Sequence, residues 1–175
     1  DADREALVCA SEASTHIAPT RLTYRAYRSC VAGLAAELTL LDVAGERVAI
    51  LLPNSLEVCI AMFAAHAAGA IVVPLNPLYT ERELDAILDD AQPRVLIYDA
   101  ARDESIDAIN GRRPIPERVR VEIGNGALTR WASEDLALPA TLPRAEELAF
   151  IQYTGGTTGR SKGVLLTHRS VSRNL

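Results

Sequence analysis

The residues best suited to chemistry lie near the C-terminal end of the sequence, in a segment rich in glycine and threonine. Glycines allow positive φ angles, so that successive backbone N–H groups can turn toward one anion. Threonine hydroxyls add short donors, and a lysine adds a full positive charge on a flexible stem. The segment therefore predicts a site for a polyphosphate. The candidate residues are Thr154, Gly155, Gly156, Thr157, Thr158, Gly159 and Lys162.

A segment of this composition can also be a simple connection between two elements. The lysine that follows the last glycine, with three threonines before it, favours phosphate binding. The Walker loop G-x-x-x-x-G-K-[ST] does not fit, since the fifth residue after Gly155 is Arg160. Lys162 is also followed by Gly163 in place of a magnesium-binding Ser or Thr. The pattern therefore disfavours a nucleotide kinase or a GTPase.

The segment Tyr153–Val164, followed by Thr-His-Arg at 167–169, resembles the signature loop of the AMP-forming acyl-CoA synthetases. This superfamily of adenylate-forming enzymes also includes adenylation domains and luciferases. Two positions depart from the commonest form, since Gly155 stands where Ser is usual and Ser161 where Pro is usual. The first change removes one hydroxyl donor and keeps the backbone donors. The Thr-Gly-Gly-Thr-Thr-Gly form is similar to that of bacterial long-chain fatty-acid CoA ligases, while aryl and amino acids stay open as substrates.

The resemblance implies that residues 1–175 are the N-terminal part of a large AMP-binding domain, whose remainder and C-terminal domain are absent. It implies an ATP-dependent ligase that adenylates a carboxylate and transfers the acyl group to coenzyme A, with Mg²⁺ accompanying ATP. The glycine- and threonine-rich loop and Lys162 would then hold the β- and γ-phosphates. In this family the adenine pocket, the magnesium-binding acidic residue and the catalytic Lys lie further along. The resemblance thus assigns no catalytic or metal-binding residue here and predicts an inactive isolated chain.

A different class of function is a stand-alone, non-catalytic module that binds phosphate or a nucleotide. A reading frame continuing past Leu175, with a second Thr/Gly/Glu-rich motif and a late Lys, would support the ligase. A native stop codon would support the module. A chain cut from a larger domain should also expose apolar surface, so we expect it to self-associate.

Composition excludes several classes of protein. With 175 residues, 49% of them hydrophobic and 23% charged, the chain can bury one sizeable core. The net charge of −5 argues against nucleic-acid binding. The three cysteines fit no metal-ligand spacing and leave one unpaired in any disulfide scheme, which predicts reduced thiols in a cytoplasmic protein. The apolar stretch Val58–Leu75 is about as long as a short transmembrane helix, but Gly69 and the β-branched residues after it divide it into a helix and a strand. His66, within this helix, is expected to be a packing residue in preference to a ligand or a base.

Residues 45–98 predict repeated β–α units. Apolar runs at 47–52, 71–73 and 94–98 have the length of strands, and helices are expected between them. The first helix, with Asn54 and Ser55 as candidate caps, is apolar on nearly every side and should be buried as far as its stop at Gly69. The second begins with a Thr80–Glu83 capping box. Because these strands show no polar alternation, we predict an α/β fold with a parallel-rich sheet covered by helices on both faces. Before this region, Thr23 is a predicted N-cap. The apolar face of its helix comprises Tyr24, Tyr27, Val31, Leu34, Ala35 and Leu38.

Residues 99–147 carry weaker signals: a helix at 103–109, a strand at 118–123 with one wet face, and a turn at 125–126. Four acidic residues could suggest a metal pair, although solvated loop charges are the favoured interpretation: Glu134, Asp135, Glu146 and Glu147. A strand is predicted at 148–153 before the phosphate loop and another at 164–166 after it. Thr167 is then expected to cap a helix that begins at His168.

Overall fold

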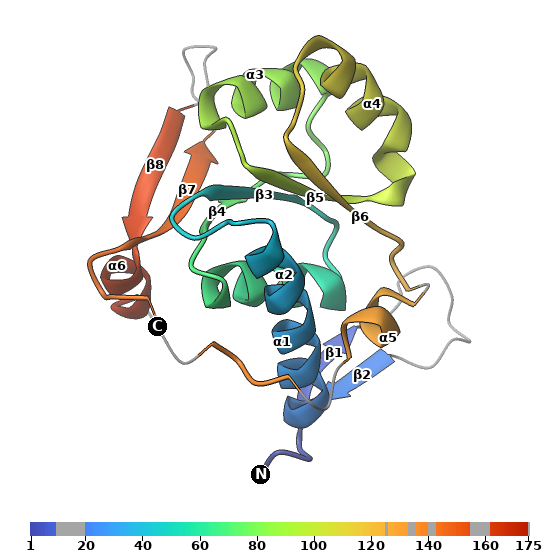
Figure 1. The fold of residues 1–175 in the computed structure, drawn as a ribbon, viewed down its shortest axis with the longest axis vertical. Coiled ribbons are helices and arrows are strands. Elements are labelled where there is room, and N and C mark those ends of the chain that lie inside the picture. Colours follow the sequence, from blue (N-terminus) through green and yellow to red (C-terminus); the bar gives the residue numbers. More distant parts are fainter. Residues whose placement is uncertain (10–19, 125, 133–135, 140–142, 155–161, 175) are drawn as a thin grey trace.

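The computed structural model describes residues 1–9, 20–124, 126–132, 136–139, 143–154 and 162–174. Its centre is a six-stranded sheet with the order β6-β5-β3-β4-β7-β8 (Figure 1). Neighbouring strands from β6 to β7 are parallel, and β8 is antiparallel to β7. The strands are β3 (Arg47–Leu51), β4 (Ile71–Pro74), β5 (Val95–Asp99), β6 (Glu117–Val121), β7 (Leu148–Thr154) and β8 (Lys162–Thr167). The predicted parallel-rich sheet is confirmed.

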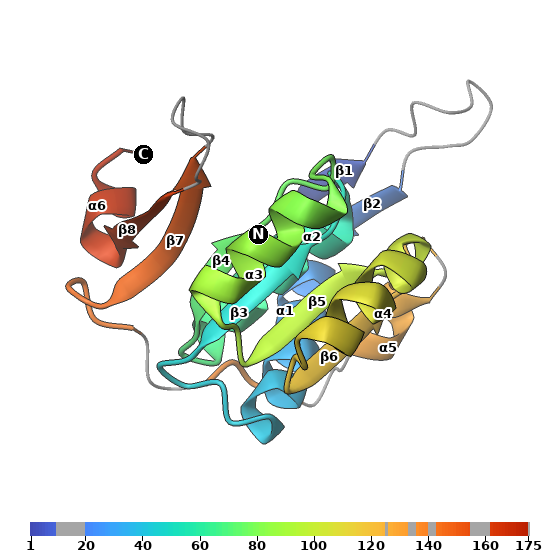
Figure 2. The same cartoon turned by 90° about the horizontal axis from the view of Figure 1, so that it is seen from above.

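Helices cover both faces of the sheet. In Figure 1, α3 (Glu81–Ala91) and α4 (Asp103–Arg112) lie above the sheet, and α1 (Tyr24–Leu40) and α2 (Leu56–Ala67) lie below it. The smaller elements are β1 (Glu5–Cys9) and β2 (Thr20–Thr23), which pair with each other, the 3-10 turn η1 (Ala100–Arg102), α5 (Ala127–Trp131) and α6 (His168–Ser172). Figure 2 shows the β7–β8 hairpin at one end of the sheet, beyond β4.

Successive residues of the central strands enter two separate cores. Val48 and Ile50 pack with α1 and α2, whereas Ala49 and Leu51 pack with α3 and α4. All four side chains are at most 1% exposed. Because side chains alternate across a strand, a strand covered on both faces must be apolar at every position. This requirement explains the unbroken apolar runs of the sequence.

Polar side chains begin the principal helices at the predicted positions. Thr23 and Ser55 accept hydrogen bonds from the backbone at the start of α1 and α2. In the capping box of α3, the Glu83 N–H donates to the Thr80 hydroxyl at 3.4 Å, and the Thr80 N–H donates to the Glu83 carboxylate at 2.8 Å. Gly69, with a φ of 78°, follows the end of α2. The predicted helix boundaries are therefore confirmed by their caps.

Two expectations about buried faces are wrong. Tyr24, predicted to lie on the apolar face of α1, is 56% exposed, because it is the first residue of the helix and the buried positions begin at Cys30. Helix α2 was expected to be buried on nearly every side, yet Phe63 is 60% exposed. The Phe63 ring forms a T-shaped contact with that of Tyr27 on α1, with centroids 5.9 Å apart. Helix α2 is thus buried on the side that meets the sheet and α1.

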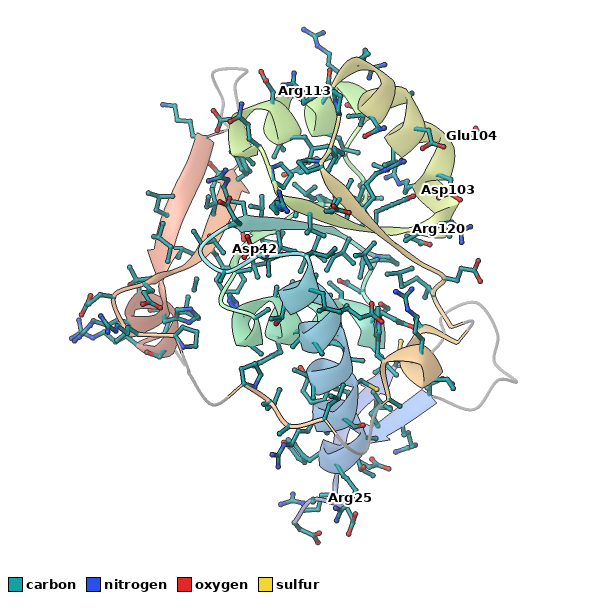
Figure 3. The ribbon with its side chains drawn as sticks, viewed as in Figure 1. Arg25, Asp42, Asp103, Glu104, Arg113 and Arg120 are labelled. Carbon is teal, nitrogen blue, oxygen red and sulfur yellow. The ribbon has the colours of Figure 1, made fainter. Side chains whose placement is uncertain are left out.

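The weaker signals between residues 99 and 147 are confirmed where the structure describes them. Helix α4 runs longer than predicted, and β6 buries Val119 and Val121 while its intervening residues are exposed. Arg120 on β6 forms an ion pair with Asp103 on α4, and both are labelled in Figure 3. Asn125 of the predicted turn, like Glu134 and Asp135, lies outside the described residues. Within the described ranges, no helix is long and apolar enough to cross a membrane.

The β7–β8 hairpin is attached to the rest of the fold through β4 and α2. Phe150 of β7 pairs in register with Val72 of β4. The centroid of its ring lies 4.8 Å from that of the His66 ring on α2. The His66 ring centroid lies 5.0 Å from that of His168 at the start of α6. Burial, and then the nearby His168, lower the pKa of His66 from 6.5 to about 4, while the backbone of Ala70 acts in the opposite direction. The predicted packing role of His66 is confirmed.

The close approach of α1 and α5 yields a test of the packing. A methyl group at Gly33 would overlap the backbone carbonyl oxygen of the buried Trp131. We expect Gly33→Ala to lower the free energy of unfolding by about 1–3 kcal/mol, because neither backbone can yield without moving its helix. The matched control is Gly111→Ala in α4, where a methyl group meets no atom within 4 Å. Urea denaturation should show the loss only for Gly33→Ala, and equal stabilities of the two variants would contradict this packing.

The His66 contact predicts a pH dependence of stability. Its folded pKa lies below the unfolded value, so between pH 6.5 and 4 the unfolded chain takes up a proton that the folded chain does not. The contribution of neutral His66 to the free energy of unfolding is therefore fully present above pH 6.5. It decreases as the pH falls below 6.5 and is lost as the pH falls through about 4. His66→Phe keeps a ring and removes the titration. Urea denaturation from pH 7 to 4 should show a steeper loss for the wild type than for the variant, and parallel curves would refute the assignment.

Candidate functional site

The two ends of the predicted phosphate loop face each other across the β7–β8 hairpin. Thr154 is the last residue of β7 and Lys162 the first of β8, and the two are paired in register. Both are exposed. The other predicted site residues lie outside the described residues: Gly155, Gly156, Thr157, Thr158 and Gly159. The structure thus brings together the first and the last of the predicted site residues.

The two faces of the hairpin carry different kinds of side chain. Residues directly opposite each other in an antiparallel pair share a face, and neighbouring residues along a strand alternate. The Thr154 and Lys162 pair therefore lies on the face opposite to that of Tyr153 and Gly163. Tyr153 packs with the core beneath α3 and is 5% exposed. At this end of the hairpin, the Tyr153 side chain is thus buried on one face, and the other face presents a hydroxyl and an ammonium group.

A hydrogen bond holds the buried face to α3. The Tyr153 hydroxyl donates to a carboxylate oxygen of Asp90 at 2.6 Å. Burial raises the pKa of the Tyr153 phenol above its usual value, the Asp90 hydrogen bond raises it further, and the charge of Arg47 acts in the opposite direction. The phenol therefore stays protonated and serves as a donor. A bond between a hydroxyl and a carboxylate at this distance is among the stronger kinds of hydrogen bond in proteins.

Gly163 is required by the close approach of Ile151 and, to a lesser degree, of the Tyr153 ring. A Cβ atom there would lie 2.8 Å from Ile151 Cγ2 and 3.3 Å from Tyr153 Cζ. The first separation is shorter than side chains tolerate, so a larger residue would force the hairpin to shift. The glycine after Lys162 thus allows the Tyr153 side chain to lie against both strands.

A cavity of ≈ 280 Å³ opens on the same face as Tyr153. Its lining includes Arg47, Asp90, Gln92, Ile151, Tyr153 and Leu165. Thr154 and Lys162 lie on the opposite face of the hairpin and do not line this cavity.

The described residues include no group of three or more His, Cys, Asp or Glu side chains that could hold a metal ion. Glu146 forms an ion pair with Arg169, and the Glu147 carboxylate accepts a hydrogen bond from the Arg144 N–H at 2.9 Å. These two residues therefore fit the predicted role of loop charges. The three cysteines are free thiols, with Cys30 buried.

Asp90 was not identified from the sequence. It is an exposed polar residue of a helix, and nothing in the local sequence indicates its hydrogen-bond partner Tyr153, 63 positions away. Gly163 was used only to exclude the Walker loop. The sequence did contain one signal for close packing at the base of the hairpin. Tyr153 stands one residue before Thr154, and Gly163 stands one residue after Lys162.

Comparisons with known proteins place these features in a family. A family described as "AMP-binding enzyme" matches residues 1–175. The chain is 39% identical over 153 residues to the long-chain-fatty-acid–CoA ligase FadD13 of Mycobacterium tuberculosis, covering 86% of this chain and 30% of that protein. The chain thus spans less than a third of the length of this relative.

Solved structures agree with the sequence matches. A Mycobacterium tuberculosis fatty acyl CoA synthetase superposes with a TM-score of 0.75 at 34% identity, over 87% of this chain and 30% of that one. The ATP-bound MatB of Rhodopseudomonas palustris gives a TM-score of 0.76 at 33% identity, over 89% of this chain and 31% of that one. Since the family match extends over all 175 residues and the fold agrees with it, the chain belongs to the family of AMP-binding enzymes.

Proposed function

We propose that residues 1–175 form the N-terminal part of the large AMP-binding domain of an AMP-forming acyl-CoA ligase. The observation that carries the proposal is the pairing of Thr154 with Lys162 at the end of a hairpin, within a chain that belongs to the AMP-binding enzymes. The length of its relatives supports the view that the complete enzyme contains further residues for catalysis.

In the proposed reaction, a carboxylate attacks the α-phosphorus of ATP, pyrophosphate leaves, and an acyl-adenylate forms. The thiol of coenzyme A then attacks the acyl carbon and displaces AMP. The contribution of this chain would be to hold the β- and γ-phosphates and to stabilise the charge that grows on the departing pyrophosphate. The residues proposed for this role are Thr154, Gly155, Gly156, Thr157, Thr158, Gly159 and Lys162.

Lys162 suits this role because none of the ion pairs formed by the described residues neutralises its ammonium. The ion pairs that the structure describes are all made by arginines. Among the described residues, no carboxylate pairs with Lys162. An exposed ammonium beside the Thr154 hydroxyl can therefore accept a phosphate without breaking an existing pair.

The similarity to long-chain-fatty-acid–CoA ligases supports a fatty acid as the carboxylate substrate. Mg²⁺ would accompany ATP, and the resemblance to adenylate-forming enzymes implies that its acidic protein ligand lies further along than residue 175. The free thiols at Cys9, Cys30 and Cys59 support a reducing compartment, and we propose the cytoplasm.

The full-length parent provides the test of the proposal. It should release pyrophosphate only when ATP and a carboxylate are both supplied, and a panel of fatty, aryl and amino acids would define the substrate. Lys162→Ala should slow adenylate formation by about a hundredfold or more, as the loss of one donor to a developing oxyanion does. The matched control is Arg173→Ala, which removes an exposed positive charge outside the hairpin. Unchanged ATP–pyrophosphate exchange in Lys162→Ala would exclude the proposed role.

A further inference from the structure

The geometry points to Asp90 as a positioning residue for the phosphate loop. Through its hydrogen bond to Tyr153, Asp90 fixes the places of Thr154 and Lys162, the two strand ends from which the loop departs. The inference rests on the proposed function and adds to it a residue from a different element, distant in the sequence.

The contact itself has the features of a rigid tether. Asp90 is an exposed residue in the last turn of α3, and its hydrogen bond to Tyr153 is partly buried. Tyr153 is buried, and its hydroxyl reaches Asp90 at 2.6 Å. Because the tyrosine has few rotatable bonds and its ring is packed, holding its hydroxyl also holds its backbone.

The Tyr153 side chain acts on both strands of the hairpin. It precedes Thr154 on β7 and pairs in register with Gly163, which follows Lys162 on β8. The ring lies so close to Gly163 that a Cβ atom there would be 3.4 Å from the Tyr153 hydroxyl oxygen. A displacement of Tyr153 would therefore move both ends of the loop, and with them the hydroxyl and the ammonium proposed to bind phosphate.

The other described attachments of the hairpin lie further from the loop. Phe150, which pairs with Val72 of β4 and contacts His66, precedes Tyr153 by three residues. His168 is at the opposite end of β8 from Lys162. Within the part of the chain that the structure describes, the Asp90 hydrogen bond is the polar link nearest to the loop.

The first experiment measures ATP-dependent adenylate formation by the full-length parent. Asp90→Ala and Tyr153→Phe each remove the same hydrogen bond, so each should lower kcat/KM for ATP by about tenfold. The double variant should lose no more than either single variant, because the bond can be removed only once. Asp90→Asn, whose amide oxygen can still accept the hydroxyl proton, should restore most of the activity, and the KM for the carboxylate should not change.

The matched control is Asp89→Ala. Asp89 is the neighbouring exposed carboxylate of α3, and it pairs with Arg113, which Figure 3 labels at the α3–α4 side of the molecule. This variant removes the same charge from the same helical turn and leaves the hairpin untouched. Its activity should equal that of the wild type.

A second measurement separates positioning from general destabilisation. If Asp90 acts by placing Lys162, then Asp90→Ala should cost much less in a Lys162→Ala background than in the wild type. An equal loss in both backgrounds, or equal activities of Asp90→Ala and Asp89→Ala, would overturn the inference.

Failure of the proposed function would be recognised separately, as a wild-type parent that releases no pyrophosphate with any carboxylate. Amide hydrogen exchange in the nucleotide-free parent would then still test whether the hydrogen bond between Asp90 and Tyr153 holds the hairpin in place. Faster exchange at Gly163 and Val164 in Asp90→Ala than in Asp89→Ala supports it, and equal exchange overturns it.

Discussion

The constraint on which the structure depends is the burial of a parallel sheet on both faces. Positions 48–51 of β3 must all be apolar, because Val48 and Ile50 face one pair of helices and Ala49 and Leu51 face the other. Among the described residues, the buried positions of the strands accordingly carry no charged side chain. Polar chemistry is confined to the ends of strands and to the sheet edge, and the predicted phosphate loop joins two strand ends at that edge.

The β7–β8 hairpin is a boundary between the buried sheet and its surroundings. β7 continues the parallel arrangement through its pairing with β4, whereas β8 reverses direction and leaves Val164 44% and Leu165 60% exposed. A hairpin with one covered face is held less firmly than a central strand. Side-chain contacts from α2 and α3 supply the missing support: His66 packs against Phe150, and Asp90 accepts from Tyr153. The helices thus do more than cover the sheet, since they fix the element that bears the site.

The sequence predicted those features that depend on local pattern. Continuous apolar runs indicated buried strands, and Thr23 and Thr80 marked the starts of helices, because these signals come from residues close together in the chain. Contacts between distant elements left no comparable pattern. The buried Glu57 carboxylate accepts from the Gly124 N–H at 3.0 Å, and the Asp90 carboxylate accepts from Tyr153, yet each partner lies more than sixty positions away. For the candidate site, the sequence predicted the two strands that flank the loop, whereas the hydrogen bond between Asp90 and Tyr153 was not predictable.

The two types of positively charged side chain, lysine and arginine, occupy different kinds of position in the chain. Lys162 is the single lysine in the sequence, and every other basic charge at neutral pH belongs to arginine. The arginines form the described ion pairs, for which a planar guanidinium with several fixed donors is well suited. An ammonium is a compact charge whose donors rotate freely, so it can follow a phosphate group whose geometry changes as a bond breaks. A chain that uses arginine for every other positively charged side chain, and lysine at the end of the predicted phosphate loop, fits our proposal that the arginines stabilise the fold and that the lysine binds the phosphates.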